Sequence, residues 1–333
     1  MSSLAFKKID VVGGSHGVGK AIVSALAVNG ANVVAVARDK GALDDLAKEL
    51  PQVEICPLDA TCDIAPDTIY ALEPDAVVVA AGAIPPTAPL SELDWDTFTR
   101  NWEVDVRMSF ELCKAALIRP MKPGGQVILI SSAAAIGGSP ISGGYAAAKR
   151  MQMFLASYAQ REGERLGRDL RFTAIAPARP MPDTRIGEAA VAGYARFLNV
   201  APADFLAGTS DRQSVGDVAR AVIETLSGVH ANMGPMLAWT PAKGLHRRPD
   251  CFRWIERDGQ RIAIHYDGPS RAPPSRQRGP AERRFSSWLE GPELLRRFRA
   301  LIEPFSVTAV VGIELALWPI GTVLDFVPSS LAN

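Results

Sequence analysis

Three side chains between residues 131 and 150 have the types and the spacing for acid–base chemistry. Ser132 lies thirteen residues before Tyr145, and Lys149 follows that tyrosine by four residues. Residues four apart share one face of a helix, so the lysine ammonium can lie beside the phenol. A tyrosine hydroxyl ionises by itself only near pH ~10, and a neighbouring positive charge favours the phenolate. The same pair also occurs on solvated helix surfaces, so its meaning depends on the rest of the chain.

A glycine-rich turn near the N-terminus is a second candidate site. The stretch "VVGGSHGVGK" follows an apolar run, precedes a helical pattern and contains Gly13, Gly17 and Gly19. Glycines at this spacing let the backbone approach a pyrophosphate, and the N–H groups of the following helix face the phosphates. A glycine turn without a ligand is the alternative, but the strand–turn–helix context favours a dinucleotide. The other residues of the turn that we expect to contact the cofactor are Ser15, His16 and Val18.

The end of the second apolar run bears on the choice of cofactor. In "AVARD", Ala37 takes the place where an acidic residue would bind an adenosine 2′-hydroxyl. Arg38 follows it and offers a guanidinium suited to a phosphate, and His16 can add a second donor. These residues favour NADP over NAD, although Asp39 partly offsets the positive charge.

The elements that must position these residues alternate along the first 240 residues. Apolar runs predict strands over residues 9–14, 31–39, 53–60, 75–82, 124–132 and 169–177. Helical spacing predicts helices over residues 19–30, 41–51, 97–121 and 143–167. Continuous apolar strands are buried on both faces, as in a parallel, doubly wound sheet. We therefore expect an α/β Rossmann-type fold with an irregular C-terminal extension.

These motifs, in this order and at this spacing, resemble those of the short-chain dehydrogenase/reductase family in its non-extended form. The resemblance covers about residues 5–240 and rests on "GGSHGVG", on "SS" at 131–132 and on "YAAAK" at 145–149. It implies a nicotinamide cofactor and hydride transfer between that cofactor and a carbonyl or secondary alcohol.

The resemblance assigns a role to each of the three side chains. Tyr145 is the expected general acid/base, because hydride transfer to a carbonyl leaves an alkoxide that needs a proton. Lys149 favours ionisation of the phenol and holds the nicotinamide ribose, and Ser132 orients the substrate oxygen. Ser131 is one residue off the family spacing, and we expect it to point into the sheet.

Other positions match the family in part. Asp59 matches the residue that contacts adenine, and Pro177 lies where the family has a turn beside the nicotinamide. The family run Asn-Asn-Ala-Gly is "VAAG" at 79–82 here, so Ala81 and Gly82 match and are expected at the cofactor. The two asparagines that this chain lacks help the family to bind the adenosine side and to brace the sheet.

A second departure is Asp105, where the family often has an asparagine whose carbonyl holds a water of the proton relay. A backbone role tolerates this change, so we count Asp105 among the expected catalytic residues. A buried carboxylate near Lys149 would change the pKa of the lysine. The alternative is that Asp105 pairs with a neighbour such as Arg107 or with solvent.

The expected function is that of an NADP(H)-dependent ketoreductase or alcohol dehydrogenase acting on a small molecule. A catalytically inactive NADP-binding sensor or assembly subunit is the alternative, since two family positions differ. A dehydratase or epimerase is disfavoured, because those enzymes more often have an extended glycine pattern. Residues 179–210 should form the substrate lid, with Arg179 and Tyr194 as candidates for substrate contact.

Composition limits the partners and the location. The formal net charge is zero, which gives no support for a nucleic acid partner. The four cysteines and four histidines form no cluster, which predicts reduced thiols and no metal site. No signal peptide is recognisable, so we expect a cytoplasmic protein. The two long helices, over 102–117 and 145–159, favour a homodimer or homotetramer.

The chain changes character after about residue 243, so we divide it into a Rossmann domain, 1–243, and an extension, 244–333. The extension contains an Arg- and Pro-rich linker and a hairpin pattern around Asp258-Gly259. The apolar stretch 305–328 carries Glu314 near its centre, which is costly inside a bilayer. We expect this stretch to pack against the main domain or a partner subunit and not to contact a membrane, and a tail that does not pack regularly is the alternative.

Overall fold

One mixed sheet organises the part of the chain that the structure describes. The computed structural model describes residues 4–119, 121–207, 213–240, 243–247, 252–257 and 260–265. The strands of the sheet are β1 (Lys8–Val12), β2 (Asn32–Ala37), β3 (Glu54–Pro57), β4 (Ala76–Val79), β5 (Gly125–Ile130), β6 (Leu170–Pro177), β7 (Met236–Thr240) and β8 (Gly244–Arg247). Their order is β3-β2-β1-β4-β5-β6-β7-β8, with β8 antiparallel to β7 and the other pairs parallel. The order reverses between β1 and β4, and doubly wound sheets bind ligands at such a switch point.

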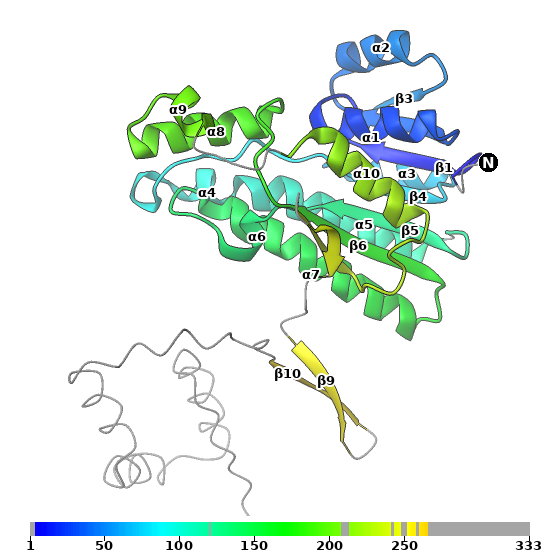
Figure 1. Cartoon of the computed structure of the whole chain (residues 1–333). Coiled ribbons are helices and arrows are strands. Elements are labelled where there is room, and N and C mark those ends of the chain that lie inside the picture. Colours follow the sequence, from blue (N-terminus) through cyan, green and yellow to red (C-terminus); the bar gives the residue numbers. More distant parts are fainter. Residues whose placement is uncertain are drawn as a thin grey trace, which may run out of the picture. The chain divides into compact units, whose positions relative to one another are not determined.

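Helices cover both faces of this sheet (Figure 1). They are α1 (Gly17–Val28), α2 (Lys40–Glu49), α3 (Ala65–Ala71), α4 (Trp95–Asn101), α5 (Arg107–Ile118), α6 (Ala134–Gly137), α7 (Gly143–Arg165), α8 (Arg185–Leu198), α9 (Pro202–Ala207) and α10 (Val215–Leu226). A 3₁₀ turn, η1 (Leu90–Glu92), precedes α4, and a π-helical turn, η2 (Trp102–Val106), joins α4 to α5. Helices α1, α2 and α10 bury their apolar side chains on one face of the sheet, and α3, α5 and α7 do so on the other.

Alternation along the strands builds the two halves of the core. Ile9 and Val11 of β1 pack with α1 and α10, whereas Val12 packs with the cluster on the opposite face. Successive strand residues point to opposite faces, so an uninterrupted apolar strand fills both layers. The same alternation places Asp10, which is fully buried, on the face that Val12 shares.

The predicted strands and helices are all present, with one change. The helix expected over 97–121 is three segments, α4, the π turn η2 and α5, because its backbone widens by one residue per turn at Trp102–Val106. The helices α3, α6, α8, α9 and α10 and the strands β7 and β8 were not predicted, and β8 carries the sheet past residue 243. The doubly wound α/β fold is confirmed.

A separate hairpin follows the sheet along the chain. Strands β9 (Phe252–Arg257) and β10 (Gln260–His265) pair antiparallel with Gln260 opposite Arg257, which confirms the predicted hairpin. The apolar stretch 305–328 lies outside the described residues. Among the residues that are described, no helix is both long enough and apolar enough to cross a membrane.

Candidate active site

A single long cleft of about 1090 Å³ lies along the carboxyl ends of the central strands. The glycine turn after β1 and Arg38 after β2 line one end, and Ser132, Tyr145 and Lys149 line the other. Ligand pockets usually enclose about 300–1,000 Å³, so the cleft is large enough for an extended ligand. The fold thus brings the two motifs predicted from the sequence into one site.

The glycine turn packs so closely that side chains would not fit. A Cβ added to Gly13, whose φ is +86°, would lie 2.5 Å from the Ala81 nitrogen. A Cβ at Gly19 would lie 2.0 Å from the Gly13 oxygen. Helix α1 begins just after His16, and no side chain caps its first N–H groups. The turn therefore offers uncapped backbone donors beside the cleft, which fits the diphosphate of a dinucleotide.

The adenosine end of the cleft carries Arg38 and Asp59. The Arg38 Nη1 atom lies 3.7 Å from Asp59 Oδ2, and the arginine side chain is 74% exposed. Partial burial favours the neutral form of Asp59, but hydrogen bonds from Thr61 and the charge of Arg38 favour the carboxylate more, so its pKa is lowered. Asp39 accepts the Ala42 N–H at 3.0 Å and so caps α2. Arg38 therefore has one weak acidic partner that an incoming phosphate would have to displace.

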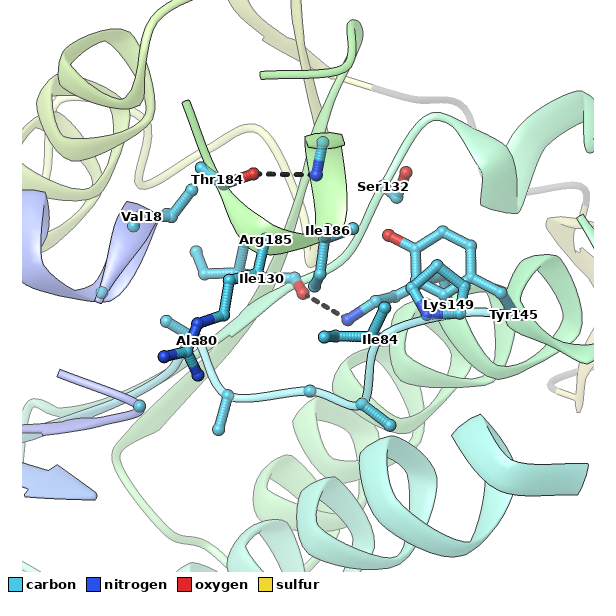
Figure 2. A pocket seen from close by; sticks show the side chains of 18 of the residues that line it. Val18, Ala80, Ile84, Ile130, Ser132, Tyr145, Lys149, Thr184, Arg185 and Ile186 are labelled. Atoms are coloured by element: carbon cyan, nitrogen blue, oxygen red, sulfur yellow. Dashed lines mark hydrogen bonds between the residues drawn. The ribbon is translucent and has the colours of Figure 1, made fainter. Parts of the chain in front are cut away.

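The hydroxyl groups of Ser132 and Tyr145 and the ammonium group of Lys149 lie together at the opposite end of the cleft from Arg38 (Figure 2). Ser132 follows β5, and its Oγ accepts the Ala134 N–H at 3.2 Å. Tyr145 lies in the first turn of α7, and its ring centroid is 5.7 Å from Lys149 Nζ. Ser131 is buried and donates to the Lys149 carbonyl at 2.8 Å, which holds the end of β5 against α7.

The Lys149 ammonium is buried and has three acceptors. It donates to the Ile130 carbonyl at 3.2 Å and to Gln152 Oε1 at 3.0 Å, and it pairs with Asp105 Oδ2 at 3.2 Å. Burial lowers the pKa of Lys149, but the charges of Asp105 and Tyr145 raise it by more, so its pKa stands above the ordinary value. An ammonium has three donors, so a ribose hydroxyl would have to share or replace one of these contacts.

Asp105 is the counter-ion of Lys149 and is itself fully buried in the π turn. Its Oδ1 accepts the Ala83 N–H at 2.8 Å, and its own carbonyl accepts the Ser109 hydroxyl at 2.7 Å. The alternative pairing with Arg107 is wrong, because Arg107 binds Asp63 instead at 2.9 Å. Asp105 therefore places a carboxylate inside the site.

Backbone contacts hold the loop after β4, where the asparagines of the family are missing. The N–H groups of Ala80 and Ala81 both donate to the Val12 carbonyl, at 2.8 and 2.9 Å. Because Gly13 packs on Ala81 directly, this loop also supports the glycine turn. The loop after β4 therefore stays attached to β1 without the two amide side chains.

The predicted lid is helical and contributes several wall residues. Pro177, at the end of β6, and Arg179 and Tyr194 line the cleft, and the Tyr194 ring stacks on Phe205 at 5.3 Å. The Arg179 N–H donates to Gln213 Oε1 at 3.0 Å. Sequence reasoning missed the wall residues Ile84 and Thr87, and it placed Thr184, Arg185 and Ile186 in the lid without naming them. No motif marks them, apart from Thr184 as a helix N-cap residue.

Comparison with known proteins agrees with this geometry. A sequence profile of the family described as "short chain dehydrogenase" matches residues 7–190, which is more than half of the chain. The chain belongs to the short-chain dehydrogenase family. The family uses a nicotinamide dinucleotide, and the residues of the cleft fit one.

Curated relatives of this short-chain dehydrogenase are dehydrogenases and reductases. It is 31% identical over 224 residues to cis-4-hydroxycyclohexanecarboxylate dehydrogenase of Sinomonas cyclohexanicum, covering 63% of this chain and 82% of the relative. It is 28% identical over 194 residues to 2,5-dichloro-2,5-cyclohexadiene-1,4-diol dehydrogenase of Sphingobium indicum, covering 53% and 74%. The match to human L-xylulose reductase is 31% identical over 105 residues, 31% of this chain, and spans less than half of that protein, 43%. These relatives share oxidoreduction of CH–OH groups.

Proposed function

We propose that this chain is an NADP(H)-dependent oxidoreductase that interconverts a carbonyl and a secondary alcohol on a small molecule. The observation that carries the proposal is the meeting of Ser132, Tyr145 and Lys149 at one end of a cleft whose other end holds Arg38. Acid–base groups and a cofactor cradle in one cavity are the parts that this reaction needs.

The preference for NADP rests on the second strand. With Ala37, the last residue of β2 carries no carboxylate that would bind a 2′-hydroxyl and repel a 2′-phosphate, and Arg38 is exposed beside the cleft. A phosphate carries more charge than the single Asp59 carboxylate 3.7 Å away, so it can displace this weak partner. His16 is within the same turn but contacts Ser15 and Arg185, which makes Arg38 the main determinant of the preference.

The chemical step divides between the cofactor and the chain. A bound nicotinamide donates or accepts the hydride. Ser132 Oγ already accepts a backbone N–H, so its hydroxyl hydrogen is left to donate to the substrate oxygen. Tyr145 gives its proton to that oxygen in reduction and takes it back in oxidation. The positive charge of Lys149, one helical turn away, stabilises the phenolate.

Asp105 acts in this scheme as a positioning residue through Lys149. Its carboxylate fixes the ammonium on the inner side of the cleft and keeps it charged. Ala83 N–H holds the carboxylate in turn, so the loop after β4 and the lysine are joined.

The substrate end of the cleft is mostly apolar. Ile84, Ile141, Ile186 and Ala190 line it together with Tyr194. Two of the relatives are named for six-membered carbocyclic alcohols. Cyclic ketones and the matching secondary alcohols are therefore the first substrates to try.

The intact constellation favours an enzyme over the inactive sensor or assembly subunit. A protein that only binds the nucleotide would not need a tyrosine and a lysine side by side in the cleft, as Tyr145 and Lys149 are. A second copy of the chain is the proposed partner, because α5 and α7 expose the aromatic side chains of Phe110 and Tyr158. A cytoplasmic location stays a prediction from the sequence.

Nucleotide titration followed by turnover tests the proposal. NADPH and NADH are titrated by fluorescence into the wild type and into Arg38→Asp, and cyclic and open-chain ketones are then assayed with Tyr145→Phe as the control. We expect NADPH to bind more tightly than NADH, and Arg38→Asp to reverse that order. Loss of the general acid should lower kcat by about 10²–10⁴-fold while nucleotide binding persists.

Two results would contradict the proposal. Failure of the wild type to bind either nucleotide would remove the cofactor and leave the fold without this chemistry. Turnover that Tyr145→Phe leaves unchanged would mean that the reaction uses another acid.

A further inference from the structure

Helix α8 begins directly opposite the glycine turn. Thr184 caps the helix, because its Oγ1 accepts the Gly187 N–H at 3.0 Å and its hydroxyl donates to the Met181 carbonyl at 2.8 Å (Figure 2). A Cβ added at Gly17 would lie 3.3 Å from the Thr184 methyl, so the lid touches the turn across the cleft. The first helical residue, Arg185, therefore stands over the uncapped N-terminus of α1.

The Arg185 side chain lines the cleft and is exposed there. Figure 2 shows its guanidinium reaching down the pocket past Val18 toward Ala80. Its Nη2 lies 3.3 Å from His16 Nε2. Within the part of the chain that the structure describes, no carboxylate forms an ion pair with Arg185, whereas Arg38 has Asp59.

The contact with His16 gives Arg185 no acidic partner. An arginine donates hydrogen bonds and accepts none, so His16 Nε2 is the acceptor in this contact. The other ring nitrogen, Nδ1, lies 2.9 Å from Ser15 Oγ. A permanently charged group that lines a cleft without a carboxylate partner is suited to bind an anion.

We propose that Arg185 binds the diphosphate of the nucleotide from the lid side and exchanges its His16 contact for the phosphate oxygens. This inference rests on the proposed function. The backbone N–H groups at the uncapped N-terminus of α1 would hold one side of a bound diphosphate. The guanidinium reaches the other side and can make two parallel hydrogen bonds to phosphate oxygens.

The same contact would couple the cofactor to the substrate wall. Ile186, Ala190 and Tyr194 follow Arg185 on α8 and line the substrate end of the cleft. A diphosphate held by Arg185 fixes the first turn of this helix and with it those wall residues. The nucleotide should therefore bind before the substrate.

The diphosphate and the 2′-phosphate are distinguishable by the choice of ligand. An arginine that contacts the diphosphate strengthens the binding of NADPH, NADH and ADP-ribose alike, because all three carry that group. An arginine that contacts the 2′-phosphate strengthens the binding of NADPH alone, which is the behaviour proposed for Arg38. Adenosine 2′-monophosphate carries the second phosphate without the diphosphate and serves as the counter-probe.

Calorimetric titration of the full-length chain with these four ligands tests the inference. The variants are Arg185→Gln, Arg185→Lys and Arg38→Gln, and Arg196→Gln is the matched control. Arg196 lies in the last turn of the same helix and donates to the Thr87 carbonyl, so its replacement changes the charge equally. Circular dichroism checks that each variant is folded.

We expect Arg185→Gln to weaken the binding of NADPH, NADH and ADP-ribose by the same factor. That factor should be about 10–100-fold, as for a lost hydrogen bond to a charged group. Arg185→Lys should lose less affinity for these three ligands, and Arg196→Gln should bind them within about twofold of the wild type. The binding of adenosine 2′-monophosphate should be unaffected by Arg185→Gln. Binding of all ligands within twofold of the wild type, or a loss confined to NADPH, would overturn the inference. If the wild type bound no nucleotide at all, the proposed function would fail with it.

Discussion

At the scale of the residue, the site holds a buried pair of opposite charges. Asp105 and Lys149 lie 3.2 Å apart, and Asp105 is fully buried. The pair satisfies itself, because Ala83, Gln152 and Ile130 supply the remaining contacts. A buried ion pair as a whole adds little net stability, but removing one partner leaves the other charge buried and unpaired, which is destabilising.

Asp105→Asn should therefore weaken the protein and change its pH profile. Without the carboxylate, burial dominates and lowers the pKa of Lys149, so the alkaline limb of kcat should move to lower pH. The stranded charge should cost about 3 kcal/mol of unfolding free energy. Urea unfolding and a kcat–pH profile measure both effects. Glu103→Gln, an exposed carboxylate on the same π turn, is the control, and an alkaline limb that coincides with the wild type would refute a role for Asp105.

At the scale of the element, the central strand β1 carries an acid that no part of the site uses. Asp10 is fully buried, and neither of its carboxyl oxygens has a hydrogen-bond partner among the described residues. Burial raises its pKa from 3.8 to about 7, with Lys8 opposing and Glu54 adding to the shift. The folded state thus holds a proton that the unfolded chain releases near pH 4. Stability falls as the pH rises between these two values.

Asp10→Asn should remove this dependence. At pH 8 the wild type bears the full cost of ionising Asp10, and the shift corresponds to roughly 4 kcal/mol. The variant should gain up to that amount at pH 8 and almost nothing at pH 4, where the wild-type acid is already protonated. Urea denaturation at the two pH values measures the difference. An equal change at both would show that packing, and not ionisation, is responsible.

At the scale of the whole molecule, one helical layer exposes three large aromatic side chains. Trp102, Phe110 and Tyr158 are each about half exposed, at 46%, 45% and 50%, on η2, α5 and α7. Helices α5 and α7 pack against each other over the same face of the sheet (Figure 1). We propose that this face binds a second copy of the chain, since symmetric dimers reuse one patch on both partners.

Phe110→Glu should shift the chain from dimer to monomer. A carboxylate opposite its own symmetry mate would repel it and would be desolvated at the interface. Sedimentation velocity on the wild type and the variant measures the state. Phe197→Glu alters an equally exposed aromatic residue on α8, 45% exposed, and should leave the dimer intact. A monomeric wild type, or a dimeric Phe110→Glu, would contradict this assembly.

Local sequence pattern was enough to predict the fold class, the six apolar strands and the residues with recognisable chemistry. Those features depend on local pattern: alternation sets a strand, and spacings of four and thirteen bring Ser132, Tyr145 and Lys149 together once the strand and the helix are in place. The contact partners of the site residues follow only from the tertiary structure. Asp105 reaches Lys149 across 44 residues, as a π turn aims it inward. Arg185 meets His16 across 169 residues, because the lid helix folds back over the glycine turn. No local pattern encodes such contacts, since they depend on where the chain returns and not on what surrounds each residue in sequence.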